Sequence, residues 1–200
     1  MRVALVALAD PGQRESVVAR LTRDGVRVAV IGECVAGAEF VLESGDDVSA
    51  VKRVEHELGA LDILVCSVES PAPAAFAGAD PVAWLSGVQE CVSVPFSLVR
   101  AAAPALRRAD DARIVLVGTG WGTAVANNTA AAAIQGAMVA FTKTLARDLG
   151  PQGILVNEIA TSPHTEARDL AAAVAYLTSP GGAAMVGQVL TLGRGGEVRP

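Results

Sequence analysis

The chain has 200 residues, 52% of them hydrophobic, which is enough to bury one substantial core but short for two. We therefore expect a single domain over residues 1–200. The net charge of −5 and the isoelectric point near 5.0 argue against a nucleic-acid or anionic-membrane surface, because both need clustered Lys and Arg to neutralise phosphate.

Two further features bear on location and on metal binding. The N-terminus has the composition of a first strand and not of a signal peptide, and no apolar run approaches the length of a membrane span, so we expect a cytoplasmic protein. Cys34, Cys66 and Cys91 are odd in number and widely spaced, which favours reduced, buried thiols over a disulfide framework. Neither His56 nor His164 stands in a ligand-like spacing, and we expect no metal site.

Short runs of β-branched residues alternate along the chain with Ala- and Leu-rich stretches of helical length. The short runs predict strands at residues 2–8, 26–31, 39–42, 61–66, 113–118, 153–159 and 187–192. Apolar residues at three- and four-residue spacing predict helices at about residues 11–24, 47–58, 81–108, 129–149 and 166–178. This alternation is typical of parallel strands that are covered by helices on both faces.

Local signals mark where several of these helices begin and end. Asp10 and Pro11 form a favourable N-cap and first helical residue. Gly25, Gly59 and Gly150 stand where helices should stop. The pattern predicts an α/β fold in which a doubly wound, parallel, seven-stranded sheet of the Rossmann type carries helices on both faces.

Three phrases of the sequence are similar to the short-chain dehydrogenase/reductase family. They are LDILV at residues 61–65, FTKTLARDLGPQGILVN at 141–157 and VGQVLTLGRGG at 186–196. They resemble the family's fourth strand, its catalytic-helix tail that leads into the "VN" strand, and its C-terminal strand. The resemblance extends from about residue 2 to residue 196, and it assigns the family's functional positions to residues of this chain.

At the cofactor turn the chain departs from the family pattern. Family members carry T-G-x-x-x-G-I-G after the first strand, because a pyrophosphate must approach the backbone closely. Here residues 7–14 read ALADPGQR, and Gly12 alone remains of the glycines. Leu8 and Arg14 each add a side chain, and Asp10 places a carboxylate at the helix N-terminus that would otherwise attract phosphate. The resemblance therefore implies a chain that binds no nicotinamide cofactor.

The family's catalytic positions also fall on altered residues. In the family, a Tyr exchanges the substrate proton, a Lys four residues later lowers the pKa of that Tyr, a Ser positions the carbonyl and an Asn supports a water relay. The corresponding residues here are Ala131, Gln135, Thr119 and Cys91, with Gly118 as the alternative for the Ser position. Thr119 alone keeps a usable group, so the resemblance implies that the catalytic site is incomplete.

The residue counts point the same way without any alignment. The whole chain has one tyrosine, Tyr176, and two lysines, Lys52 and Lys143, so it contains no Tyr-x-x-x-Lys. Tyr176 lies in AAAVAYLTS, which indicates a packing residue of a late helix. The family carries a long substrate lid after the VN strand, whereas residues 161–166 (TSPHTE) lead here almost at once into the next helix.

The apolar pattern is intact although the chemistry is altered in several places. Family members assemble through two long helices and the last strand region, here about residues 82–108, 129–149 and 183–196, which remain rich in Ala, Val, Leu and Gly. Our leading hypothesis is a non-catalytic subunit that pairs with an active short-chain dehydrogenase/reductase paralogue, or otherwise with itself. Trp84 and Trp121 serve either as interface anchors or as core residues.

Three alternatives stay open. The first is a cofactor-independent lyase, cyclase or isomerase that uses Thr119, Cys91 or His164. The second is a sensor that binds a nucleotide through Arg14 and Glu33 without turning it over. The third is an NAD(P)-dependent oxidoreductase that uses atypical residues.

Overall fold

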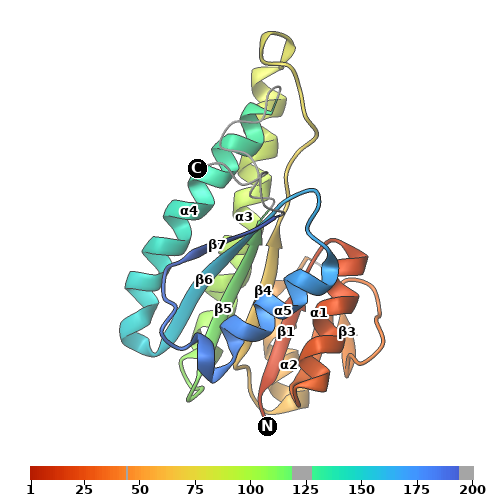
Figure 1. Cartoon of the computed structure of the whole chain (residues 1–200), viewed down its shortest axis with the longest axis vertical. Helices are drawn as coiled ribbons and strands as arrows, with labels where there is room; N and C mark the ends of the chain where they lie inside the picture. Colours follow the sequence, from red (N-terminus) through yellow and green to blue (C-terminus); the bar gives the residue numbers. More distant parts are fainter. Residues whose placement is uncertain (44, 119–127, 194–200) are drawn as a thin grey trace.

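The computed structural model describes residues 1–43, 45–118 and 128–193, which build one parallel sheet between two layers of helices (Figure 1). The sheet has seven strands in the order β3-β2-β1-β4-β5-β6-β7. The strands are β1 (Val3–Ala7), β2 (Arg27–Ile31), β3 (Phe40–Leu42), β4 (Ile63–Val68), β5 (Ala112–Gly118), β6 (Ile154–Thr161) and β7 (Val189–Leu192). The α-helices are α1 (Pro11–Arg23), α2 (Asp47–Leu58), α3 (Pro81–Leu106), α4 (Thr129–Leu149) and α5 (Ala167–Thr178). The fold class expected from the sequence is confirmed.

Most helix ends follow the expected local chemistry. Asp10 caps α1 by accepting a hydrogen bond from the Gln13 backbone, and Gly59 ends α2 in the left-handed conformation, with φ of 83°. The helix α4 also stops where expected, at Leu149 with Gly150 as its C-cap. Gly150 has φ of −55°, and the chain continues through a 3₁₀ turn, Gly150–Gln152, until Gly153 turns it at φ of 81°.

Two cores fill the space between the layers. The helices α1 and α5 cover one face of the sheet, where α1 packs on β1 and β2 and α5 packs on β5 and β6, with residues such as Val17, Leu170 and Val174 in the core. The helices α2, α3 and α4 cover the opposite face with a larger cluster. The strand order reverses between β1 and β4, and a doubly wound sheet places its ligand cleft at that point.

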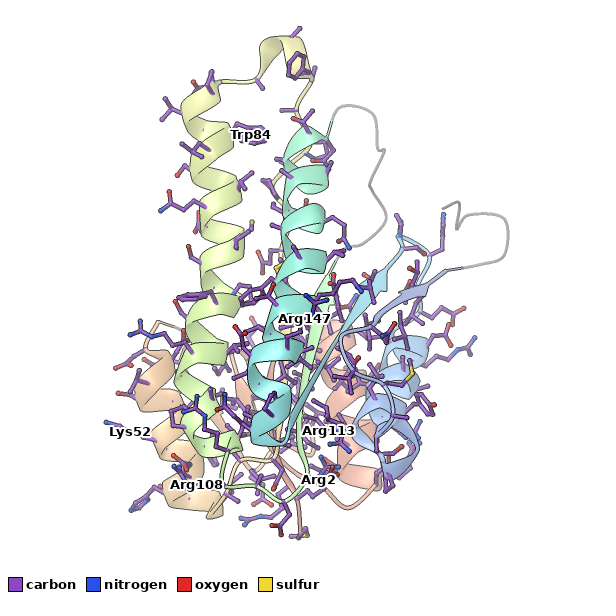
Figure 2. The ribbon with its side chains drawn as sticks, turned by 90° about the vertical axis from the view of Figure 1, so that its left-hand side faces the viewer. Arg2, Lys52, Trp84, Arg108, Arg113 and Arg147 are labelled. Carbon is purple, nitrogen blue, oxygen red and sulfur yellow. The ribbon has the colours of Figure 1, made fainter. Side chains whose placement is uncertain are left out.

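The helices α3 and α4 extend beyond the carboxyl edge of the sheet (Figures 1 and 2). All seven buried residues of α3 lie at or after Pro95, so residues 81–94 include none. In this half of α3, Val88, Cys91 and Val92 are partly buried against the core, and Gly87 lies near Pro71 in the segment after β4. The short 3₁₀ helix η1, Phe76–Gly78, lies near the tip. We call residues 81–94 the α3 overhang.

Among the described residues, one helix, α3, is long and apolar enough to cross a membrane by length and composition. Its mean hydropathy over an 18-residue stretch is 1.3. The expectation that no apolar run approaches this length is therefore wrong for α3. The C-terminal half of α3 is packed in the core, and the overhang is about 21 Å long at 1.5 Å per residue. A span needs about 30 Å, so this fold leaves too little of α3 free to cross a bilayer.

Candidate functional site

The carboxyl ends of β1, β2 and β4 surround an open cleft of about 720 Å³. The turn after β1, the loop after β2 and the segment after β4 form three sides of the cleft, and α3 closes the fourth with residues that include Glu90, Cys91 and Val94. This is the position where a doubly wound sheet binds a nucleotide. The lining of the cleft therefore decides which ligands the chain can accept.

The turn between β1 and α1 is closed by its own side chains. Asp10 Oδ1 accepts a hydrogen bond from the Gln13 backbone nitrogen at 2.7 Å, and the Ala9 backbone nitrogen donates to Ser67 Oγ at 3.0 Å. The N-terminus of a helix carries a partial positive charge that attracts phosphate. Here a carboxylate already occupies that end, so an incoming phosphate would meet a like charge.

Arg14 lies below the same turn and is 4% exposed. Its guanidinium donates one hydrogen bond to the Leu8 carbonyl at 2.7 Å and contacts Glu33 Oε2 at 3.3 Å. A Cβ added at Gly32 would lie 3.5 Å from Arg14 Nη1, which places the guanidinium between the β1–α1 turn and the end of β2. Arg14 therefore ties two loops together, and its pairing with Glu33 engages both residues that a nucleotide sensor would need.

We expected the side chain of Leu8 to obstruct the cleft. The structure directs it elsewhere. Its side chain is 1% exposed and packs in the core beside α1 and α5. In a strand, every second side chain points to the same face, and Ala4 and Val6 belong to the same core. The bulk that we expected at this turn is directed into the core.

The cleft is acidic. Of the described residues that line it, Glu33, Glu69 and Glu90 carry carboxylates and Arg14 is the one cation. The cation is buried and already paired, whereas Glu33, Glu69 and Glu90 are exposed. The local field therefore opposes the binding of a pyrophosphate or a 2′-phosphate.

The thiols near the cleft are poorly suited to act as nucleophiles. Burial raises the pKa of the Cys66 thiol to about 12, and burial followed by repulsion from Glu69 and Glu90 raises the pKa of Cys91. A thiolate is the reactive form of cysteine, so both sulfurs remain protonated at neutral pH. All three cysteines are free, and Cys34 is exposed, which contradicts its expected burial. Within the described residues, no group of His, Cys, Asp and Glu forms that could hold a metal ion.

The positions that the resemblance assigns to Tyr and Lys lie on the first turns of α4. Ala131 is half-buried, and its backbone nitrogen donates to the N-cap residue Asn128 at 3.1 Å. Gln135 follows one turn later and is 5% exposed. Thr119, assigned to the Ser position, lies outside the described residues, as does Trp121.

Gln135 belongs to a buried polar cluster between α4 and the sheet. Its Nε2 donates to Glu158 Oε1 at 3.3 Å, and Thr142 Oγ1 donates to Glu158 Oε2 at 3.1 Å. Glu158, on β6, has no exposed surface. A Cβ added at Gly118 would lie 3.2 Å from Glu158 Oε1, so the end of β5 also borders the cluster. Gly118 therefore cannot take the larger side chain that the Ser position needs unless the carboxylate moves.

Burial raises the pKa of Glu158, and the hydrogen bonds from Thr142 and Gln135 and the charge of Lys143 oppose that increase in part. Sequence reasoning missed this residue. The signal was a lone carboxylate within the apolar strand ILVNEIAT, at a position that alternates in phase with the buried Ile154 and Val156. A charged residue on the buried face of a central strand predicts a partner on the helix above it.

The remaining expected residues lie away from the cleft wall. Tyr176 is half-exposed on α5, which covers the opposite face of the sheet from α4. The connection from β6 to α5 is residues 162–166, and it is closed by hydrogen bonds of Thr165 Oγ1 with the Ser162 backbone at 2.8 Å and with the Leu192 carbonyl at 3.0 Å. The short loop that we expected in place of a lid is present. His164, in this loop, is exposed.

The outer surface of α3 and α4 is apolar. Phe96 and Phe141 lie 6.3 Å apart between ring centroids and connect the two helices, and Phe96 is still 50% exposed. Val82, Leu85 and Val94 on the overhang are also exposed. Within residues 81–99 Glu90 is the one charged residue, and residues 129–142 contain none. We call this surface the α3–α4 face.

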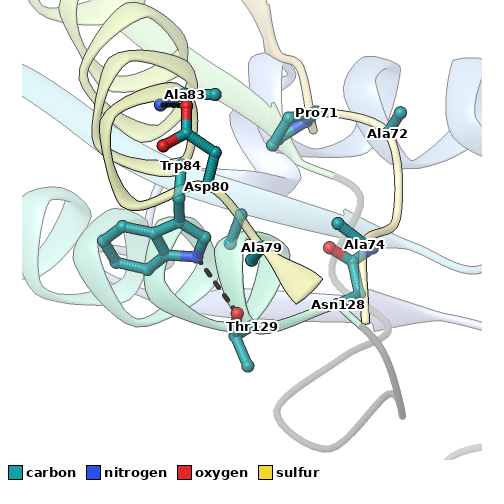
Figure 3. Close-up of a pocket in the computed structure, with 10 residues that line it drawn as sticks. Pro71, Ala72, Ala74, Ala79, Asp80, Ala83, Trp84, Asn128 and Thr129 are labelled. Atoms are coloured by element: carbon teal, nitrogen blue, oxygen red, sulfur yellow. Dashed lines mark hydrogen bonds between the residues drawn. The ribbon is translucent and has the colours of Figure 1, made fainter. Parts of the chain in front are cut away.

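Trp84 connects the tips of the two helices. Its indole Nε1 donates to Thr129 Oγ1 at 3.0 Å, beside a cavity of about 140 Å³ that Pro71, Asp80 and Asn128 help to line (Figure 3). Figure 2 shows Trp84 between the upper turns of α3 and α4, far from Lys52 and Arg108 at the opposite end. Trp84 is half-buried by contacts within the chain, so it stiffens the tip.

Comparison with known proteins identifies similar sequences. The family described as "Enoyl-(Acyl carrier protein) reductase" matches residues 4–167. Subunit BbsC of (2S)-[(R)-hydroxy(phenyl)methyl]succinyl-CoA dehydrogenase from Thauera aromatica is 25% identical over 198 residues, which cover 86% of this chain and 79% of that protein. Nodulation protein G from Azospirillum brasilense is 27% identical over 179 residues, or 80% and 73% of the two chains.

Solved structures share the fold. The 3-ketoacyl-(acyl-carrier-protein) reductase from Brucella melitensis, complexed with NADH, superposes with a TM-score of 0.86 and 22% identity over 98% of both chains. A short-chain dehydrogenase/reductase from Serratia marcescens superposes with a TM-score of 0.83 and 25% identity over 96% of this chain and 95% of its own. At 22% identity the first likeness concerns the fold alone.

Proposed function

Because this chain belongs to the short-chain dehydrogenase/reductase family, we propose that it serves as a non-catalytic subunit that pairs, through its α3–α4 face, with an active dehydrogenase of the same family. The partner supplies the cofactor site and the catalytic residues. This chain supplies a rigid docking surface that stabilises the partner or completes its pocket. We place the pair in the cytoplasm.

The observation that carries this proposal is the α3 overhang. Fourteen residues of a long apolar helix extend past the sheet without one buried member, and Val82, Leu85 and Phe96 leave large apolar surfaces in water. Exposed apolar patches of this kind mark interaction sites in folded proteins. The near absence of charge on this face favours a protein partner with a matching apolar helix surface.

The cofactor cleft supports a non-catalytic role. The residues present do not fit a dinucleotide, because Asp10 caps α1, Arg14 is held by carbonyl groups and Glu33, and exposed carboxylates line the wall. On α4, Ala131 and Gln135 offer no group that could exchange a proton with a substrate.

The name of one relative is compatible with an assembled protein. BbsC is named as a subunit of a dehydrogenase, which supports a role for this chain within a larger enzyme. The rival reading, a cofactor-independent enzyme, needs a reactive group at the cleft. The raised pKa of Cys91 opposes that role for its thiol.

The test is untagged purification from the native source, followed by reconstitution from the two purified chains. We expect a dehydrogenase with an intact Tyr-x-x-x-Lys to accompany this chain, and light scattering to show a defined complex when the chains are mixed. A chain that remains a monomer at high concentration, both alone and with that dehydrogenase, would contradict the proposal and would move the cofactor-independent enzyme to first place.

A further inference from the structure

The helix α4 carries few large apolar side chains toward the sheet. Its buried residues are Ala130, Ile134, Gln135, Met138, Thr142, Ala146 and Leu149. Before Leu149, only Ile134 and Met138 of this buried set are large and apolar, and methionine adapts to many packing environments. The outer face is also small, with Gly136 and Ala140 exposed. Farther along the helix, Phe141 and Leu145 are partly buried against the core. Over residues 130–140, apolar packing therefore discriminates weakly between neighbouring rotations of α4 about its axis.

Glu158 discriminates strongly between these rotations. Its two oxygens accept hydrogen bonds from Gln135 and Thr142, which are seven residues apart and so lie two turns apart on one side of the helix. Glu158 is fully buried. A rotation that breaks both contacts would leave a buried carboxylate without a partner, which is among the least favourable states inside a protein.

The lower half of α4 has a separate anchor. Lys143 Nζ donates to the Gly187 carbonyl at 3.2 Å, and a Cβ added at Gly187 would lie 3.2 Å from Ala146 Cβ. That contact holds the end of the helix near β7. The first half of α4, which contributes to the α3–α4 face, is held by the hydrogen bond from Trp84 to Thr129 at its tip and, against the sheet, by Glu158.

We propose that Glu158 is a positioning residue of the docking surface: by holding Gln135 and Thr142, it selects the rotation of α4 that turns Gly136 and Ala140 outward. The role in docking rests on the proposed function. The rotation itself is a property of the isolated chain and is tested separately.

Two variants separate positioning from stability. The combination Glu158→Met, Gln135→Met and Thr142→Val replaces the cluster by apolar groups of similar size and leaves none of its polar groups unpaired. Glu158→Gln keeps both contacts, because its amide can accept from Gln135 and donate to the Thr142 hydroxyl. Thr178→Val, a buried Thr on α5, is the matched control for the loss of a hydroxyl.

The measurements are backbone amide resonances by NMR and a thermal melt. In the wild type, Glu158→Gln and Thr178→Val, we expect one resonance per amide in residues 130–142. In the triple variant we expect doubled or broadened resonances in that segment alone, with a melting temperature no lower than that of the wild type. Single sharp resonances in a folded triple variant would show that apolar packing sets the rotation and would overturn the proposal.

If the triple variant does not fold, the double variant Glu158→Gln, Gln135→Met tests whether Glu158 sets the rotation of α4. It keeps the Thr142 contact and removes the contact nearer the start of α4, so broadening should be confined to residues 130–138. Sharp resonances there would contradict the proposal.

Docking is measured by sedimentation with the dehydrogenase that co-purifies with the wild-type chain, or with the chain alone if it self-associates. If the competent rotation falls to about one tenth of the population, affinity falls about tenfold. We expect that loss in the triple variant and wild-type affinity in Glu158→Gln. Broadened resonances with unchanged affinity would overturn the role in docking. A wild type that binds nothing would refute the proposed function, while the NMR result would still decide the rotation.

Discussion

Gln135 donates a hydrogen bond to Glu158 across 3.3 Å, from the first turns of α4 to the central part of β6. Gln135 stands at the position that the resemblance assigns to the catalytic lysine. The side chain at this position is therefore directed toward a buried carboxylate. The contacts of any residue that replaces Gln135 will depend on the negative charge of Glu158.

The pair Ala131→Tyr with Gln135→Lys should not create reductase activity. The new ammonium group would pair with Glu158, which would weaken its effect on the pKa of the new phenol, and the cofactor turn would be unchanged. The measurement is NADPH oxidation with a generic ketone. A rate above the wild-type background would show that the cofactor cleft is competent.

The wild-type chain should not bind NADH or NADPH at physiological concentration. The carboxylate of Asp10 occupies the helix N-terminus, and Glu33, Glu69 and Glu90 line the cleft. Calorimetric titration measures this directly. The positive control is the 3-ketoacyl-(acyl-carrier-protein) reductase from Brucella melitensis, whose structure was solved with NADH. A dissociation constant of about 100 μM or tighter, which is about −5.5 kcal/mol, would contradict it.

The substitution Ala140→Arg should dissociate the assembly. It places a charge on the exposed side of α4, in the centre of the proposed contact, where an unpaired buried charge costs several kcal/mol. The matched control is Ala19→Arg, at an exposed alanine of α1 on the other face of the sheet. Light scattering should report a smaller particle for the first variant and an unchanged one for the second. Equal masses for both would place the interface elsewhere.

The substitution Glu158→Gln should stabilise the fold at neutral pH by about 1 kcal/mol, because it removes a buried charge and keeps its hydrogen bonds. Burial raises the pKa of Glu158 above its unfolded value, so the folded state binds the proton more tightly. The wild type therefore loses stability as pH rises from the unfolded pKa through the folded one. Urea unfolding at several pH values should show a gap between the two proteins that is largest above the folded pKa and shrinks in acid. A gap that does not change with pH would contradict this assignment.

The order of elements could be predicted almost completely, because hydrophobic period and helix caps are local signals. Expected and observed boundaries differ by at most two residues, as at β4, expected at 61–66 and observed at Ile63–Val68. The end of α4 at Gly150 was predicted, whereas the 3₁₀ turn that follows it, Gly150–Gln152, was not. Leu8 was misjudged because the loss of a glycine was interpreted without the strand's alternation, which assigns Leu8 to the core face.

The site was harder to predict than the fold. The resemblance singled out Cys91 and Gln135 as positions to examine, but their surroundings depend on residues far away in sequence. Glu158 lies 23 positions from Gln135 in the chain, and the pairing arises only when α4 is packed across β6. Likewise, no local pattern shows that Arg14 would turn beneath its own loop to meet Glu33.

The α3 overhang has a consequence for the amount of this protein in the cell. A partner that binds only the folded chain raises its stability by mass action, in proportion to the logarithm of the partner's free concentration. Synthesised without that partner, the chain would present Val82, Leu85 and Phe96 to chaperones and proteases. Its abundance would then follow the supply of the partner. The two chains would accumulate in matched numbers even if their messenger RNAs were present in unequal amounts.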